Sequence, residues 1–254
     1  ITYYGGKRDQ TSRNTRVKAR VKAEALREFI TVKDKIFVMG HQLTDVDSFG
    51  AAIGIYRAAN ALEKRAYIVI NEVSASLKPL YTAYENNPDY PERLFLNSAE
   101  ALELADESSM VVVVDTNRPG MTECEELLHV AKTIVVLDHH RQSSDNIDNA
   151  LLSYIEPYAS SACEMVSEVL QYIVDDIKIP NLEASSLYAG IMIDTNNFMN
   201  KTGVRTFEAA AFLRRSGADI TLVRKMFRDD MESYRAKAQI ISSAEVYHNK
   251  YAIA

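Results

Sequence analysis

The 254-residue sequence lacks the features that disulfide-rich, membrane-spanning and fibrous proteins depend on. Its two cysteines, Cys124 and Cys163, are too few for a disulfide scaffold or a thiolate zinc site, which favours a reducing compartment such as the cytosol. No apolar run approaches the ~18 residues that a membrane-spanning helix requires. Hydrophobic residues make up 47% and charged residues 25% of the chain, which excludes disorder and collagen-like repeats and indicates a globular protein.

The sequence also starts without an initiator methionine or the apolar stretch of a signal peptide, so we expect a fragment of a longer protein. Basic residues are concentrated at this end, where residues 1–22 carry seven basic side chains and one acidic side chain. The net charge of the chain is −6, so the remaining 232 residues carry −12. An acidic body argues against binding duplex nucleic acid through a broad cationic face, and it fits a carboxylate-rich site that needs cations.

From Lys35 onward, short β-branched runs alternate with longer amphipathic segments. This alternation predicts an α/β fold with a mostly parallel, five-stranded sheet flanked by helices, followed by a helix-rich subdomain and a linker helix. The predicted strands are 36–39, 66–70, 93–96, 110–115 and 133–138. The predicted helices after Lys35 are 48–64, 76–86, 98–105, 124–132, 161–174, 182–193, 206–217, 219–227 and one near 230–244, before a hairpin at 245–254.

Four polar clusters each follow an apolar segment, and the first three follow predicted strands. They are residues 40–48, 115–117, 138–140 and 194–197. Ligands of open α/β sheets bind at the carboxyl ends of the strands, so the first three clusters are expected to lie at that edge. A single aspartate there is most often a helix N-cap, and a lone histidine pair is most often a polar loop. Because these explanations would have to hold independently at every cluster, we predict a metal site.

The residue types in these clusters limit which metal is expected. Imidazoles mixed with carboxylates, without thiolates, suit Mn²⁺, with Mg²⁺, Co²⁺ or Fe²⁺ as alternatives. Six or seven ligands are too many for one tetrahedral zinc. They suit two metals ~3.5–4 Å apart that share a bridging carboxylate and activate a water for in-line attack at phosphorus.

The clusters resemble the motifs of the DHH phosphoesterase superfamily over residues ~35–230, through His41-x-x-x-Asp45-x-Asp47, Asp115 and Asp138-His139-His140. The resemblance implies that one metal is held by His41, Asp45 and Asp115. It implies that a second metal is held by Asp47, Asp115, His139 and Asp194, so that Asp115 bridges the two. It also implies catalytic roles for Asp115, His140 and Asp138, with Asp138 orienting a ligating imidazole and His140 facing the substrate phosphate.

Longer segments resemble the GdpP-type cyclic di-AMP phosphodiesterases. They are GHQLTDVDSFGAAIGIYRAA (40–59), VVVVDTNRPG (111–120), VVLDHHRQ (135–142), YIEPYASSACEMVSE (154–168) and AGIMIDTNNFMNKTGVRTFEAAAFLR (189–214). This resemblance implies that cyclic di-AMP is hydrolysed to linear 5′-pApA. The alternatives are a short-oligonucleotide nuclease or a pyrophosphatase of the same superfamily, or an inactive nucleotide-binding sensor. The complete ligand set argues against the sensor.

The same resemblance predicts three parts of the chain. Residues 1–33 are the tail of a preceding, degenerate GGDEF domain plus a linker helix, 34–229 are the DHH domain, and 230–254 are a linker helix and the start of a truncated DHH-associated domain. The glycine-rich motif that holds substrate in that last domain is missing, since the chain has nine glycines in all. Family members carry N-terminal transmembrane helices, so we expect this part in the cytoplasm and the longer protein in the cell membrane. A homodimer is left open.

Four residues are predicted to contact the cyclic dinucleotide, namely His140, Arg205, Phe198 and Asn197. Arg118, Arg141 and Arg205 follow the metal clusters and suit phosphate oxygens, although a solvated loop arginine is an equal interpretation for the first two. Phe198 would stack on an adenine or pack in the core. Ser160 and Ser161 fit a helix cap better than a ligand contact.

Overall fold

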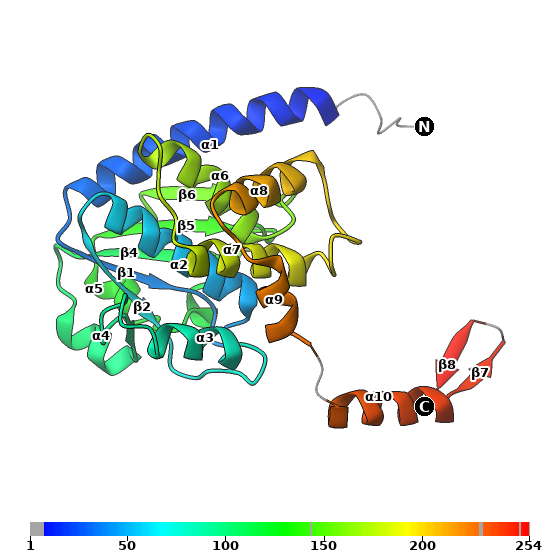
Figure 1. Ribbon diagram of the computed structural model, residues 1–254. Helices are drawn as coiled ribbons and strands as arrows, with labels where there is room; N and C mark the ends of the chain where they lie inside the picture. The colour runs from blue at the N-terminus through cyan, green and yellow to red at the C-terminus, as the bar shows by residue number, and fades with distance from the viewer. Residues whose placement is uncertain (1–7, 143, 229–230, 249, 254) are drawn as a thin grey trace.

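The computed structural model describes residues 8–142, 144–228, 231–248 and 250–253. At the centre of this part of the chain is a six-stranded sheet in the order β3-β2-β1-β4-β5-β6 (Figure 1). The strands are β1 (Lys35–Met39), β2 (Arg65–Val69), β3 (Phe95–Leu96), β4 (Met110–Val114), β5 (Thr133–Asp138) and β6 (Leu152–Ile155). Neighbouring strands in this sheet are parallel throughout. The predicted α/β class, with a parallel sheet flanked by helices, is confirmed.

The predicted number of five strands is wrong, because β6 adds a sixth strand beside β5. Tyr154 of β6 lies opposite Leu137 of β5. Leu152 and Tyr154 are buried, whereas Ser153 between them is exposed. An edge strand of four residues with a polar member gives a weak sequence signal, especially after the long polar loop that precedes it.

Helices connect the strands and continue the chain after the sheet. They are α1 (Arg8–Thr31), α2 (Val46–Ala61), α3 (Lys78–Glu85), α4 (Ser98–Leu104), α5 (Leu127–Val130), α6 (Ala162–Ile173), α7 (Asn181–Asp194), α8 (Val204–Arg215), α9 (Ile220–Met226) and α10 (Met231–Ser243). The hairpin of β7 (Glu245–Tyr247) and β8 (Tyr251–Ile253) follows, and Figure 1 shows it standing apart from the sheet together with α10. Among the described residues, no helix combines the length and apolarity needed to cross a membrane.

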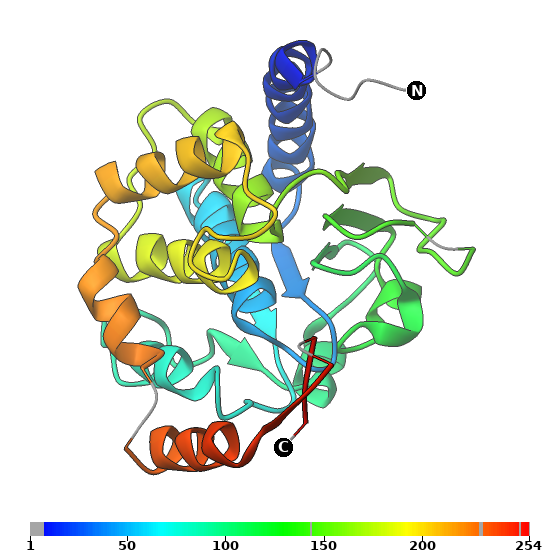
Figure 2. The same cartoon turned by 90° about the vertical axis from the view of Figure 1, so that its right-hand side faces the viewer.

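Alternate side chains of the strands enter two separate cores. In β4, Val112 and Val114 belong to the larger core, whereas Val111 and Val113 belong to the smaller one. Residues of α1, α2, α6 and α7 contribute to the larger core, and residues of α4 and α5 contribute to the smaller core. Figures 1 and 2 show how these helices are arranged around the sheet. Because both faces are covered, β4 and β5 are buried along their whole length, which explains their continuous apolar sequences.

The strand order reverses between β1 and β4, which are neighbours in the sheet. The chain runs outward from β1 to β2 and β3, then returns to the other side of β1 to build β4, β5 and β6. Such a reversal leaves a crevice at the carboxyl ends of the two strands, where open α/β sheets bind ligands. Residues 40–48 follow β1 and residues 115–117 follow β4, so the first two predicted metal clusters flank this crevice.

Helix α1 packs on the same body as the helices that follow the sheet. Ala23, Leu26 and Ile30 of α1 are buried in the larger core. The first seven residues of the predicted tail at 1–33, and the predicted boundary at 229–230, lie outside the described residues. The division into three parts stays a prediction.

Candidate metal centre

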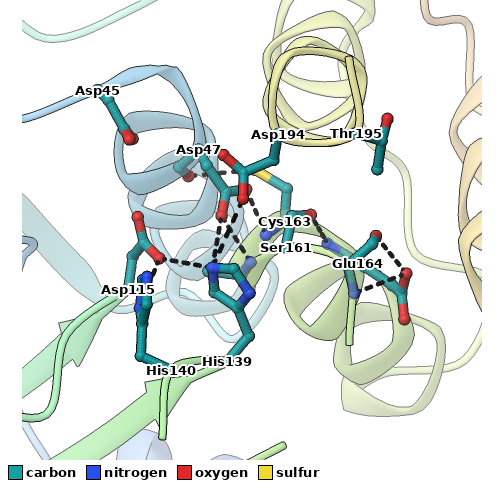
Figure 3. Close-up of polar contacts among 12 residues, drawn as sticks. Asp45, Asp47, Asp115, His139, His140, Ser161, Cys163, Glu164, Asp194 and Thr195 are labelled. Carbon is teal, nitrogen blue, oxygen red and sulfur yellow. Dashed lines mark hydrogen bonds and ion pairs between the residues drawn. The ribbon is translucent and has the colours of Figure 1, made fainter. Parts of the chain in front are cut away.

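The predicted metal ligands converge from four elements, and Figure 3 labels all of them except His41. His41, Asp45 and Asp47 come from the loop after β1 and the first turn of α2. Asp115 directly follows β4, His139 directly follows β5 and Asp194 ends α7, as the structure places them. All six side chains therefore meet beside the reversal point of the sheet.

His41, Asp45 and Asp115 form the first candidate ligand group, with ligand atoms within 4.8 Å of one another. The Nε2 atom of His41 lies 3.4 Å from Asp115 Oδ2 and 3.7 Å from Asp45 Oδ2. The other oxygen of Asp45 accepts a hydrogen bond from the Ser48 backbone N–H at 2.9 Å. Asp45 therefore caps α2 with one oxygen and faces the ligand group with the other.

Asp47, His139 and Asp194 form the second candidate group. His139 Nε2 lies 3.7 Å from Asp47 Oδ2 and 3.6 Å from Asp194 Oδ2 (Figure 3). It also lies 3.2 Å from Asp115 Oδ1. One oxygen of Asp115 thus faces each group, which is the arrangement that a carboxylate shared by two cations requires.

Asp115 is held in an unfavourable state by the surrounding fold. Its side chain is 3% exposed, and its buried Oδ1 atom lies 3.2 Å from His139 Nε2 but accepts no hydrogen bond of ordinary geometry among the described residues. Its backbone has a φ of +61°, in the left-handed region that non-glycine residues seldom adopt. Orphaned polar atoms and strained backbones of this kind cluster at functional sites. A cation at Oδ1 would satisfy the orphaned oxygen, so the residues present fit a bound metal.

The carboxylates in this site repel one another. Burial, together with the charges of Asp115 and Asp194, raises the pKa of Asp47 well above its ordinary value. Burial also raises the pKa of Asp194, and Asp115 adds to that effect. Burying several like charges is unfavourable unless a cation compensates them. The electrostatics of the site therefore also favour divalent cations.

The same carboxylates act on the two imidazoles in the opposite sense. Hydrogen bonding to Asp115 and Asp45 raises the pKa of His41 to about 10. Burial disfavours a charged His139, but the neighbouring carboxylates, led by Asp115, raise its pKa to about 9. The raised pKa values favour the protonated form of both imidazoles. A metal that binds there would displace these protons, because a ligating imidazole must be neutral.

Helix α6 holds Asp47 in place through its N-terminus. The backbone N–H groups of Ala162 and Cys163 donate to the two oxygens of Asp47, at 2.6 Å and 2.9 Å (Figure 3). Ser161 caps this helix by accepting a hydrogen bond from the Glu164 backbone N–H at 3.0 Å, which confirms the expected cap. The sequence showed the cap, but not that the helix start is bound to a predicted metal ligand 115 residues earlier.

Asp138 holds the imidazole of His140 in this structure, and its implied role in orienting a ligating imidazole stays a prediction. Asp138 Oδ1 accepts from the His140 backbone N–H at 3.0 Å and lies 2.8 Å from His140 Nδ1. Asn117, to which the sequence assigned no role, donates from Nδ2 to Asp138 Oδ2 at 2.6 Å. Asp138 raises the pKa of His140, whose side chain is 59% exposed. The Nδ1 atom of His140 also lies 3.7 Å from Asp115 Oδ1. A third candidate ligand group consists of Asp115, His139 and His140.

The site opens into a cavity of about 490 Å³. The imidazoles and carboxylates line it together with Arg118 and Arg141. Both arginines are exposed, and in the described part of the chain neither guanidinium forms an ion pair. Free guanidinium groups next to a carboxylate-rich centre suit the phosphate oxygens of a substrate.

Arg205 does not reach this cavity. Its guanidinium forms a paired contact with Glu168 at 2.7 Å and 2.6 Å, and it lies 3.8 Å from Glu164 and 3.9 Å from Glu156. Arg205 is not among the residues that line the cavity. Three carboxylates surround the guanidinium in this structure, which favours a structural role for Arg205, and its substrate contact stays a prediction.

Phe198 and Asn197 also lie outside the lining of the cavity. They belong to a segment after α7 in which Asn196, Asn197 and Phe198 all have positive φ angles. The ring of Phe198 packs 5.7 Å from the rings of both Tyr188 and Phe207. This matches the core-packing alternative for Phe198, and the substrate contacts of both residues stay predictions.

The fold and the site define a member of a known family. Residues 35–191 match the family described as "DHH family, N-terminal domain", and the chain belongs to this family. It is 40% identical to the cyclic-di-AMP phosphodiesterase PdeA of Listeria monocytogenes serotype 1/2a and to the cyclic-di-AMP phosphodiesterase GdpP of Bacillus subtilis. These similarities cover all of this chain and 39% of each relative, so the chain spans about two-fifths of the length of these relatives.

A solved structure shows the same fold. It is the crystal structure of an exopolyphosphatase-related protein from Bacteroides fragilis, with a TM-score of 0.72 and 19% sequence identity. The similarity covers 89% of this chain and 66% of the other chain. At this identity the likeness supports the fold, and the chemistry has to be argued from the site itself.

Proposed function

We propose that this chain carries the catalytic centre of a two-metal phosphodiesterase that hydrolyses cyclic di-AMP to linear 5′-pApA. The observation that carries the proposal is the position of Asp115, with one oxygen toward His41 and the other toward His139. Membership of the DHH family supports a phosphoesterase, and identity to relatives named cyclic-di-AMP phosphodiesterases supports the substrate.

The two ligand groups would each hold one divalent cation. His41, Asp45 and Asp115 would hold the first, and Asp47, Asp115, His139 and Asp194 would hold the second. Mixed imidazole and carboxylate ligands suit Mn²⁺, with Mg²⁺, Co²⁺ or Fe²⁺ as alternatives. Bound there, such a pair would supply Lewis acidity toward the phosphodiester and would lower the pKa of water.

The chain's own residues would hold the diester and determine where it breaks. His140, positioned by Asp138, would donate a hydrogen bond to a phosphate oxygen from the mouth of the cavity. Arg141, which also lines the cavity, would add positive charge beside the phosphate. Attack by water in line with the P–O3′ bond releases the 3′-oxygen and leaves the phosphate on the 5′ side. The 2′-hydroxyl takes no part, so no cyclic phosphate forms.

Product analysis tests this proposal. The chain is incubated with cyclic di-AMP and Mn²⁺, and the products are identified by chromatography with mass spectrometry. We expect 5′-pApA, no 2′,3′-cyclic phosphate, and loss of turnover in Asp115→Asn. Faster turnover of linear dinucleotides than of cyclic di-AMP would favour the short-oligonucleotide nuclease. Binding of cyclic di-AMP without turnover in the presence of metal would favour the nucleotide-binding sensor.

The longer protein is the subject of further proposals. Because the relatives are about two and a half times as long as the matched part, the activity is proposed for the longer protein as well. Anchoring in the cell membrane through segments outside this chain, a cytoplasmic position for residues 1–254, and homodimer formation stay predictions.

A further inference from the structure

One wall of the cavity carries two exposed apolar side chains. Leu43 is 87% exposed and Met121 is 47% exposed, and both line the cavity that the predicted metal ligands share. A single exposed leucine is ordinary on a protein surface. Apolar side chains inside a ligand cavity are different, because they supply most of the contact area while a few polar groups fix the orientation of the ligand.

The loop that carries Leu43 is tied down from below. Thr44, the next residue, is buried, and its Oγ1 atom lies 2.8 Å from Glu123 Oε1. Asn71 Nδ2 donates to the other oxygen of Glu123 at 2.7 Å, which fixes the carboxylate in turn. Because Thr44 is anchored in the protein, its neighbour Leu43 is left on the cavity side of the loop.

The segment that carries Met121 is bound to the same loop. The backbone N–H of Gln42 donates to the Met121 carbonyl at 2.8 Å, and the N–H of Glu123 donates to the Gly40 carbonyl at 3.0 Å. His41 and Thr122 form a β-bridge between these two hydrogen bonds. Leu43 and Met121 therefore stand on one braced wall, and their exposure is a fixed property of the fold.

Arg118 adds a cation to this wall. It lies three residues before Met121, it lines the cavity, and its guanidinium forms no ion pair in the part of the chain that the structure describes. Apolar side chains beside a planar guanidinium suit the face of a purine, which is flat, weakly polar and able to stack on arginine. The wall begins two residues after His41, so a base attached to a diester at the metal ligands would be close to it.

We propose that Leu43 and Met121 form a platform on which one purine of the dinucleotide substrate packs, with the Arg118 guanidinium against the same base. This platform rests on the proposed function of the site and adds a determinant of specificity to it. The metal ligands recognise the phosphodiester, and the platform distinguishes a diester that carries bases from one that does not.

The test compares two substrates in matched variants. One substrate is cyclic di-AMP, and the other is an abasic dinucleotide that keeps the ribose–phosphodiester–ribose unit without bases. The Leu43→Ala/Met121→Ala variant is expected to lower the ratio of kcat/KM for cyclic di-AMP to that for the abasic diester about tenfold, mainly through KM. Leu151→Ala removes a leucine that is 59% exposed outside the cavity, and it is expected to leave the ratio unchanged.

Measurements of turnover and of binding test the platform independently of the proposed function. An unchanged ratio, or an equal loss on both substrates, would overturn the platform while leaving the phosphodiesterase proposal intact. If the wild-type chain turns over neither diester, the proposed function fails and the platform is tested by calorimetric binding of cyclic di-AMP with Mn²⁺ present. A dissociation constant about tenfold weaker in the double variant supports the platform, and an unchanged constant overturns it.

Discussion

At the scale of single residues, Asp115 joins the two ligand groups. It is buried, its backbone lies in the left-handed region, and its Oδ1 atom lacks a hydrogen bond among the described residues. Each feature costs free energy in the metal-free protein, and a shared cation pair would offset that cost. Metal binding would therefore explain why the fold retains the unfavourable conformation and burial of Asp115.

Replacing Asp115 with alanine is expected to abolish binding of both metals, because its two oxygens face both ligand groups. His41→Ala is expected to weaken one metal, and His139→Ala mainly the other. Calorimetric titration with Mn²⁺ gives the stoichiometry and affinity for each variant. If Asp115→Ala still bound two Mn²⁺ ions with wild-type affinity, the bridging role would be wrong.

Protons are expected to compete with metals at His41 and His139. Their pKa values of about 10 and about 9 mean that both imidazoles are protonated at neutral pH in the metal-free protein. Protons compete with the metal until the pH exceeds these pKa values, so Mn²⁺ affinity should decrease on acidification and increase with pH up to about pH 10. Calorimetry in buffers of different ionisation enthalpy should detect protons released on binding at pH 7.5. An affinity that stays constant from pH 5.5 to 8.5, without proton release, would exclude both histidines as ligands.

At the scale of elements, the close approach of α2 and α7 brings Asp47 and Asp194 together. Gly190 makes this approach feasible, because a Cβ atom there would lie 3.0 Å from Asp47 Cα and 2.4 Å from Cys163 Sγ. Three helices, α2, α6 and α7, are thus packed tightly around the second ligand group. The position of the ligands follows from this packing.

Gly190→Ala is expected to lower the free energy of unfolding by roughly 1–3 kcal/mol, because the added methyl group overpacks the contact. It is also expected to weaken metal binding at Asp47. Gly203→Ala is the matched control, since a Cβ atom there meets nothing within 4 Å. Urea denaturation gives the free energy of unfolding of both variants. Equal stability of the two variants would show that the close approach of α2 and α7 is not required.

Arg205 connects α8 to α6 through buried carboxylates. Arg205→Met is expected to lower the free energy of unfolding by roughly 3–5 kcal/mol, because the largely buried Glu168 carboxylate would lose the guanidinium that pairs with it. Arg215→Met, at an exposed position of the same helix, should change it little. A variant of Arg205 with wild-type stability and a strongly raised KM would instead support the predicted substrate contact.

At the scale of the whole molecule, the sequence predicted the α/β class because strands covered on both faces read as apolar runs, as in β4 and β5. It also predicted where the clusters would lie, since the carboxyl ends of parallel strands share one edge. It missed β6, whose four residues at the sheet edge carry little periodic signal. The strands β4 and β5 could be predicted because they are buried along their whole length, whereas β6 was missed because it is partly exposed.

Contacts between distant segments could not be predicted from the sequence. The three carboxylates around Arg205 lie 37 or more residues away from it, and no local pattern connects them. The same holds for the hydrogen bonds from the start of α6 to Asp47. Residue type and spacing indicated the chemistry of the site, whereas the tertiary structure determines which side chains are free to perform it.

The most direct test of the account is anomalous diffraction at the manganese edge from crystals grown with Mn²⁺. We expect two peaks ~3.5–4 Å apart on either side of Asp115, one beside His41 and Asp45 and the other beside Asp47, His139 and Asp194. No peak at Asp115 in metal-replete crystals, or a single peak that does not contact it, would contradict the two-metal centre.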